Sequence, residues 1–105
     1  MKNIEARIEE FVSVVQDVVN EDWKVNGYSF AGPPEISVKF GKKYAKIVKG
    51  GAEHQMGVHS FVNIENGDIL KAASWKAPAK HARGSIFDAD QGRSAISPYG
   101  AVYLR

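Results

Sequence analysis

The chain has 105 residues, 44% hydrophobic and 25% charged, with a formal net charge of +2 and no cysteine. This length and apolar content predict a single folded domain over residues 1–105, and the missing thiols exclude a disulfide framework, a thiol nucleophile and a cysteine-based zinc site. No apolar run approaches the ~18 residues of a membrane span, and the acidic, amphipathic N-terminus lacks the pattern of a signal peptide, so we expect a cytoplasmic protein.

The first predicted element is an amphipathic helix over residues 3–20. Its apolar residues recur at spacings of three and four, which is the period of one helical face: Ile4, Ile8, Phe11, Val15 and Val18. Three more valines, Val12, Val14 and Val19, widen this stripe beyond what one contact needs. We therefore expect the helix to cover its own sheet, and we also expect a homo-oligomer, most simply a dimer.

Residues 21–35 are a predicted connector, because two glycines and the Pro33–Pro34 pair interrupt regular structure. From residue 36 the apolar period changes to two, which is typical of strands. Strands are expected at 36–40, 44–48, 58–64 and 68–72. Gly41–Lys42 and Asn66–Gly67 mark hairpin turns between them, and the second pair favours a type I′ turn. A slightly longer loop is the alternative there, because a two-residue turn would place the like-charged Glu65 and Asp68 opposite each other.

The next stretch, KAASWKAPAKHARGSIF at residues 71–87, carries four cations and no acid. Pro78 can begin a helix, Ala79–Arg83 are compatible with one or two helical turns, and Gly84 can end them in a left-handed conformation. A strand at 85–87, a loop at 88–98 and a last strand at 100–105 follow. The predicted fold class is therefore α+β: an antiparallel sheet of about six strands within residues 36–105, with the N-terminal helix and a short helix before the last strands.

Sequence motifs for catalysis or cofactors are missing. No phosphate-binding glycine loop, nucleophile elbow or metalloprotease motif is present, and the three histidines, His54, His59 and His81, lack ligand spacing. Two loop acids, Asp88 and Asp90, are too few oxygen ligands for calcium. We predict no catalytic residue, no metal and no cofactor, and we expect a binding protein rather than an enzyme. A small hydrolase or nuclease stays open as a third interpretation.

The basic stretch suggests a seat for an anion with a flat face, such as a phosphorylated nucleotide-like molecule. Arg83 is the first candidate, because its planar fork grips phosphate through two parallel hydrogen bonds. Lys76 and Lys80 would share its helical face, and Arg105 is a further candidate. Trp75 or Tyr99 would offer a stacking surface. The structural alternatives are that Arg83 caps helix-end carbonyls or pairs with Asp88, and that Trp75 fills the core under the short helix.

A second group of cations lies in the predicted first hairpin. Its five lysines stand without any acid between residues 36 and 49: Lys39, Lys42, Lys43, Lys46 and Lys49. By contrast, the first 22 residues hold six acids and two cations. This uneven charge predicts a polarised surface. The alternative function is therefore a nucleic-acid or host-protein binding module that uses the lysine hairpin at 39–49.

Three segments also resemble a set of small, mostly uncharacterised proteins encoded by bacteriophages. They are KYAKIV at residues 43–48, FVNIENGDILKAASWKAPAKHARGSIFD at 61–88 and PYGAVYLR at 98–105. More loosely, the size and order of elements are similar to phage anti-defence sponges of the Thoeris anti-defence one type. Such sponges hold cyclic ADP-ribose-like immune signals without cleaving them. The resemblance implies sequestration of a small signalling nucleotide in the infected bacterial cell, and it assigns no individual ligand residue.

Overall fold

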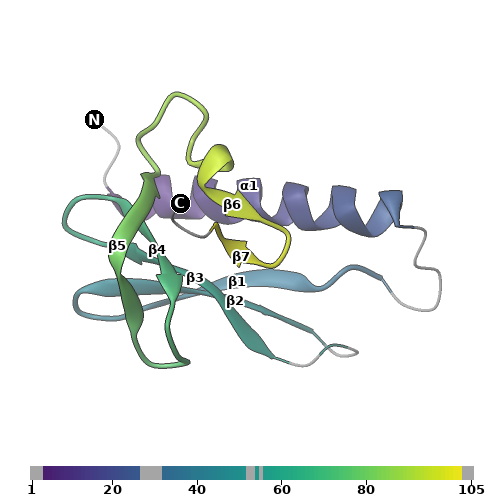
Figure 1. The fold of residues 1–105 in the computed structure, drawn as a ribbon, viewed down its shortest axis with the longest axis horizontal. Coiled ribbons are helices and arrows are strands. Elements are labelled where there is room, and N and C mark those ends of the chain that lie inside the picture. Colours follow the sequence, from purple (N-terminus) through teal and green to yellow (C-terminus); the bar gives the residue numbers. More distant parts are fainter. Residues whose placement is uncertain (1–3, 27–31, 52–53, 55, 103–105) are drawn as a thin grey trace.

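The computed structural model describes residues 4–26, 32–51, 54 and 56–102. In this part of the chain the elements follow in one order (Figure 1): α1 (Ile4–Val25), β1 (Glu35–Phe40), β2 (Tyr44–Gly50), β3 (Gly57–Asn63), β4 (Asp68–Ala72), β5 (Pro78–Ser85), the 3-10 turn η1 (Arg93–Ala95), β6 (Ile96–Ser97) and β7 (Gly100–Ala101). No helix within it is long and apolar enough to cross a membrane.

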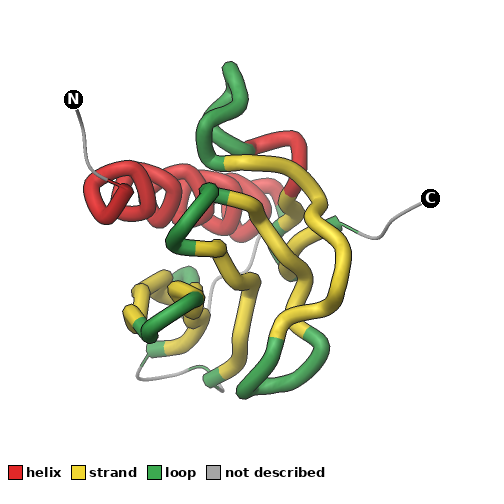
Figure 2. Tube along the Cα trace, turned by 90° about the vertical axis from the view of Figure 1, so that its left-hand side faces the viewer, coloured by secondary structure: helices red, strands yellow, loops and turns green. Residues whose placement is uncertain are grey.

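Strands β1 to β5 form one antiparallel sheet in the order β1-β2-β3-β4-β5, so every strand pairs with its neighbour in sequence. Strands β6 and β7 make a separate two-stranded ribbon. Helix α1 runs along one face of the five-stranded sheet, and the β6–β7 ribbon lies beside it on the same face (Figure 1). Seen along the helix, the sheet is strongly curved (Figure 2). The predicted α+β fold with an antiparallel sheet is therefore confirmed.

The core lies between α1, the inner face of the sheet and the β6–β7 ribbon. Alternate strand residues point inward, as the period of two predicts. The buried apolar residues of this core cluster are Ile8, Phe11, Val15 and Val19 on α1, Ile36, Ala45, Ile47, Val62 and Ile69 on the sheet, and Ile86, Ala95, Ile96 and Ala101 beyond it. Val12, Val14 and Val18 pack partly against this cluster. Most of the wide valine stripe is thus covered within the chain itself.

Helix α1 continues to Val25, beyond the predicted end at residue 20. The five residues after Asn20 include no helix breaker, and Asn26 closes the last turn: its side-chain amide donates to the carbonyl oxygen of Asp22 at 2.9 Å. The prediction that the connector begins at residue 21 was therefore wrong. Strand β1 begins at Glu35, one residue before the prediction.

The segment from Pro78 to Ser85 is strand β5, so the predicted short helix there is wrong. Its residues favour a helix locally, but β4 offers an unpaired edge, and this tertiary pairing overrides the propensity. Pro78 stands at the first strand position, where its missing N–H is tolerated. Gly84 does not adopt a left-handed conformation. Instead, it makes room for η1, because a Cβ atom on Gly84 would lie 2.7 Å from the Cβ atom of Ala95.

The turn between β3 and β4 is the longer loop rather than the type I′ turn. Gly67 has a φ of +80° and donates its N–H to the carbonyl oxygen of Asn63 at 2.8 Å. Asn66 is not in the left-handed region, and its side chain accepts the N–H of Asp68 at 2.9 Å. The predicted loop at 88–98 contains η1 and β6, and the last strand is β7 within the described residues. Residues 103–105 of the predicted strand 100–105 lie outside them.

Candidate functional site

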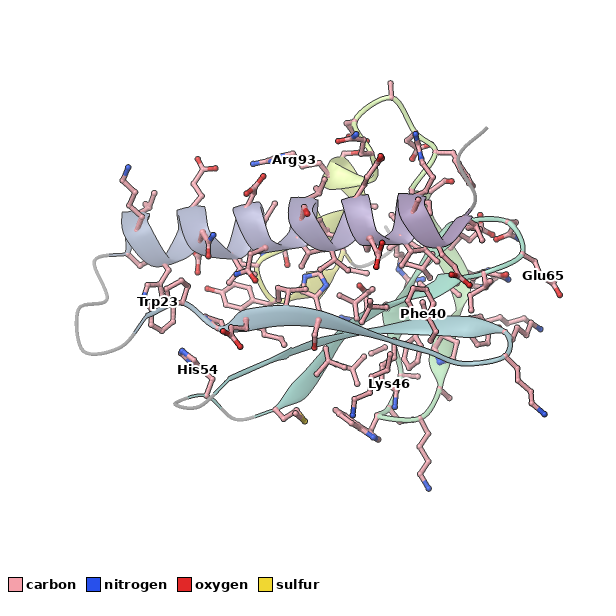
Figure 3. All side chains as sticks on the ribbon, turned by 180° about the vertical axis from the view of Figure 1, so that it is seen from behind. Trp23, Phe40, Lys46, His54, Glu65 and Arg93 are labelled. Carbon is pink, nitrogen blue, oxygen red and sulfur yellow. The ribbon has the colours of Figure 1, made fainter. Side chains whose placement is uncertain are left out.

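The outer face of the sheet, away from α1, carries Lys39 and Lys46 of the first hairpin, whereas Lys49 bonds to Pro98 on the side of the β6–β7 ribbon. Because Ala45 and Ile47 point into the core, their neighbour Lys46 points outward. Figure 3 shows Lys46 on this outer side. Lys39 lies directly opposite Lys46 in the β1–β2 register. Like charges in directly opposite positions repel each other, so this lysine pair destabilises the β1–β2 hairpin slightly.

Both ammonium groups meet one exposed indole ring, that of Trp75. The Nζ atom of Lys46 lies 4.3 Å from the centre of the ring, and the Nζ atom of Lys39 lies 5.8 Å from it. The ring is 41% exposed. Each cation–π contact at such a site contributes about 0.5–1 kcal/mol, which offsets part of the repulsion between the two lysines.

The loop that carries Trp75 is a tight turn between β4 and β5. The N–H groups of Ala73 and Ser74 both donate to the carbonyl oxygen of Ala77 at 3.1 Å. The hydroxyl oxygen of Ser74 accepts the N–H groups of Lys76 and Ala77 at 3.3 and 3.2 Å. Since β4 and β5 shift register twice, the hairpin twists more strongly than a regular one. This twist accounts for the loop's position over the outer face of β2.

Toward the first hairpin turn, the half-buried ring of Tyr44 packs on the buried ring of Phe61. Tyr44 and Phe61 form an edge-to-face pair with ring centres 6.2 Å apart, and the Nζ atom of Lys43 lies 5.5 Å from the centre of the Tyr44 ring. A shallow hollow of about 360 Å³ opens here, lined by Lys39, Phe40, Gly41, Lys42, Lys43, Tyr44, Lys46, Phe61 and Lys76. We call these residues together with Trp75 the lysine–tryptophan patch. It contains no acidic side chain.

This patch unites residues that sequence reasoning had assigned to two different sites. Trp75 and Lys76 belong to the predicted anion seat, and the other lysines belong to the hairpin at 39–49. Exposed ammonium groups bind phosphate oxygens, and exposed aromatic faces stack on nucleobases. The composition of the two segments was a visible signal, but nothing in the sequence indicated that they meet.

Arg83 is engaged in the structure by backbone carbonyl groups. Its Nε atom donates to the carbonyl oxygen of Val102 at 2.8 Å, and its guanidinium group also donates to the carbonyl oxygen of His81. Asp88 instead accepts the N–H of Ser85 at 3.0 Å. Since residues 78–85 form a strand, the helical face that would unite Lys76, Lys80 and Arg83 does not exist. Lys80 is exposed on β5, outside the lining of the hollow.

The remaining predicted ligand residues lie elsewhere. Trp75 does not fill the core. Tyr99 is 74% exposed, and the Nζ atom of Lys49 lies 5.4 Å from the centre of its ring. Tyr99 does not line the hollow of the lysine–tryptophan patch. Arg105 lies outside the described residues.

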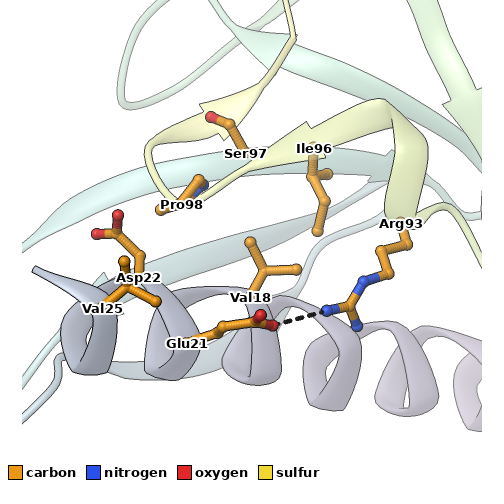
Figure 4. Close-up of a pocket in the computed structure, with 8 residues that line it drawn as sticks. All are labelled: Val18, Glu21, Asp22, Val25, Arg93, Ile96, Ser97 and Pro98. Atoms are coloured by element: carbon orange, nitrogen blue, oxygen red, sulfur yellow. Dashed lines mark hydrogen bonds and ion pairs between the residues drawn. The ribbon is translucent and has the colours of Figure 1, made fainter.

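A second concave surface lies between the C-terminal half of α1 and the β6–β7 ribbon (Figure 4). It has a volume of about 490 Å³ and is lined by Val18, Glu21, Asp22, Val25, Arg93, Ile96, Ser97 and Pro98. An ion pair of 3.4 Å between Arg93 and Glu21 joins its two sides. Both side chains are well exposed, so this pair adds little to stability. The mixed charges of this groove do not favour one class of ligand.

His59 is a buried titratable group, only 2% exposed. It is the extra residue of a β-bulge, because Ser60 pairs with Ile47 and Val58 pairs with Val48. Its Nε2–H donates to the carbonyl oxygen of Ser97 at 2.9 Å, and its Nδ1 atom accepts the hydroxyl of Ser60 at 3.0 Å. Both ring nitrogens are thereby bonded to protein groups, which gives His59 a structural role between β3 and the β6–β7 ribbon.

The pKa of His59 is lowered from 6.5 to about 4, mainly by burial; the hydrogen bond to Ser97 opposes the change, and the positive charges of Lys49 and Lys71 add to it. The ring is therefore neutral at pH 7. Burial also lowers the pKa of Lys49, against the attraction of Asp22. The ammonium group of Lys49 donates to the carbonyl oxygen of Pro98 at 3.0 Å. In the described part of the chain, no three histidine or acidic side chains gather in a way that could hold a metal ion.

Comparison with known proteins identifies a protein family but no activity. No curated protein and no solved structure matches the chain significantly. The model of a family of unknown function (DUF7717) matches residues 1–100. This match covers all strands of the sheet, the lysine–tryptophan patch and His59. The chain therefore belongs to the DUF7717 family of unknown function.

Proposed function

We propose that the protein is a non-enzymatic binding protein whose lysine–tryptophan patch holds a single strand of nucleic acid. The observation that carries this proposal is the convergence of Lys39 and Lys46 on the exposed ring of Trp75. Proteins that bind single strands without reading their sequence combine cations that track the backbone with aromatic faces on which bases stack. The patch has both components on one surface.

The shape of the patch favours a strand over a small free ligand. A pocket for a small molecule normally encloses most of its ligand and presents a few buried polar groups. The hollow here is shallow, and its lysines are exposed or half-buried. Among the described residues, no buried side-chain nitrogen or oxygen is left without a hydrogen-bond partner, so no unpaired polar atom awaits a specific ligand. A polyanion gains from several weak contacts at once.

The sequence resemblance provides the context of the proposal. In line with it, we propose that the protein acts in the cytoplasm of an infected bacterium, where the strand comes from the phage or from the host. A homo-oligomer would offer the strand two copies of the patch. Sequestration of a small phosphorylated nucleotide, as in the sponge analogy, is the alternative that the following experiment separates.

The test is fluorescence anisotropy with a labelled oligothymidine of about 20 nucleotides, titrated at several salt concentrations. Each phosphate contact on a single strand contributes about −0.7 to the log–log slope of affinity against salt, so three contacts give about −2. Lys46→Ala should reduce the slope by about 0.7. Trp75→Ala should weaken binding by roughly 5- to 150-fold, because stacking contributes about 1–3 kcal/mol per base. Lys24→Ala, at an exposed lysine on α1, is the matched control and should change little.

Two results would contradict the proposal. One is the absence of binding at low salt, or binding that neither substitution weakens. The other is tight binding of a mononucleotide or cyclic dinucleotide with little salt dependence, which would establish the small-ligand alternative. Gel analysis of the labelled strand after incubation tests the non-enzymatic part, since shortened products would indicate a nuclease.

A further inference from the structure

The two outer strands of the five-stranded sheet differ in how their free edges are treated. The free edge of β5 is irregular and therefore a poor template for another strand. The register of β5 with β4 shifts twice, the strand begins with Pro78, and Arg83 bonds to the carbonyl oxygens of His81 and Val102. Strand β1 pairs with β2 in an unbroken register over Glu35–Phe40 and has no bulge. A regular edge of this kind is a template for another strand.

The register identifies which backbone groups of β1 are available. Gly41 donates its N–H to the carbonyl oxygen of Tyr44 at 2.9 Å at the turn, so every second residue before it, Lys39 and Ser37, also bonds to β2. Ile36, Val38 and Phe40 therefore direct their N–H and C=O groups away from the sheet. Within the described residues, no group bonds to the N–H or C=O of Val38.

A side chain of α1 already occupies one end of this edge. The amide of Gln16 accepts the N–H of Ile36 at 2.8 Å and donates to the carbonyl oxygen of Pro34 at 2.9 Å. Gln16 thus takes the place that a neighbouring strand would have, and it satisfies backbone groups before the regular part of the edge begins. The open part extends from the C=O of Ile36 to Phe40.

We propose that a second copy of this chain binds this open edge, with the two β1 strands antiparallel and the two-fold axis at Val38. In this register residue 36 faces residue 40 of the second copy, so the free backbone N–H and C=O groups of each β1 strand meet those of the other. The two Val38 residues exchange a hydrogen bond in each direction, and at each end the N–H of Phe40 bonds to the C=O of Ile36. The N–H of Ile36 stays with Gln16.

The side chains of β1 are complementary to themselves in this register. On the inner face, the ring of Phe40, 45% exposed in one copy, meets Ile36 of the second copy. On the outer face, Glu35 lies diagonally across from Lys39 of the second copy, an attractive pair that occurs twice. Val12 lies one turn before Gln16 on the same side of α1 and adds apolar surface near the junction. A shift by one residue toward the turn would instead place the two Lys39 side chains face to face.

Cysteine crosslinking tests both the partner and the register, because the chain has no cysteine of its own. In Val38→Cys the two Cα atoms would lie about 5.5 Å apart, which suits a disulfide. In the matched variant Phe40→Cys the two thiols would be four residues apart along the strand, about 14 Å, which is too far. We expect mild oxidation to convert Val38→Cys to a covalent dimer and to leave Phe40→Cys monomeric. Equal crosslinking of both variants, or none in Val38→Cys, would overturn the proposal.

Sedimentation equilibrium provides the second measurement on unmodified protein. We expect a concentration-dependent species of twice the 11.5 kDa chain mass, and at least tenfold weaker association for Val38→Pro, which removes the outward N–H. Val38→Ala loses side-chain volume but keeps this N–H, so it should remain closer to the wild type. A wild-type chain that stays monomeric at several hundred micromolar would refute the dimer. No nucleic acid is present in these experiments, so they succeed or fail independently of the proposed function.

Discussion

Acid should destabilise the protein through the single side chain of His59. The folded-state pKa is about 4, below the ordinary value of 6.5, so the folded protein binds this proton less readily than the unfolded chain. Stability from the neutral ring is therefore fully present above pH 6.5 and is lost as the pH falls from 6.5 toward 4. From these two values the loss is about 2 kcal/mol at pH 5 and about 3 kcal/mol near pH 4.

Urea unfolding between pH 7 and pH 5, followed by tryptophan fluorescence at constant ionic strength, measures this loss. Asp90 does not interfere, because its pKa is lowered from 3.8 and its contribution is lost only at more acidic pH. His59→Gln is the control, since its amide offers a donor for Ser97 and an acceptor for Ser60 but does not titrate. The control should lose about 2 kcal/mol less between the two pH values than the wild type. Equal losses in both proteins would refute the assignment to His59.

Two substitutions test the tertiary contacts of β5. Arg83→Ala should lower the free energy of unfolding by about 1.5–3 kcal/mol, because it removes charged hydrogen bonds to backbone carbonyls, while oligonucleotide titrations stay unchanged. Weaker oligonucleotide binding with an unchanged melting temperature would instead indicate that Arg83 binds the ligand. Gly84→Ala should cost about 1–3 kcal/mol in thermal unfolding, because its Cβ would crowd that of Ala95; an unchanged melting temperature would contradict the close packing of η1 on β5.

Local patterns were sufficient for most of the fold. The helical stripe predicted α1, and the alternation after residue 35 predicted β1 to β4, because both periods reflect one buried face. The segment at Pro78–Ser85 was misread as a helix, since alanine, lysine and arginine favour helices and the pairing with β4 has no local signal. The two-residue strand β6 is too short to show any period.

For the candidate site, the sequence indicated the residue types but not that they lie together. The lysine hairpin at 39–49 and the ring of Trp75 were both recognised, yet they were assigned to separate hypotheses. Their meeting depends on the twist of the β4–β5 hairpin, which follows from two register shifts that no residue type announces. The carbonyl partner of Arg83 lies 19 residues away in sequence, which explains why a ligand role and a structural role could not be separated from the sequence.

The neighbour-to-neighbour order of the strands has a consequence for synthesis on the ribosome. Each strand can pair as soon as the next one has emerged. The apolar face of α1 is fully covered only much later, because its buried residues share a cluster with Ile86 and Ile96. At about 5–20 residues per second, the chain between Val19 and Ile96 takes roughly 4–15 seconds to appear. During this interval sheet residues such as Ile36 and Ile47 can cover only part of the helical stripe, so we expect the nascent chain to expose apolar surface to chaperones until the native core closes.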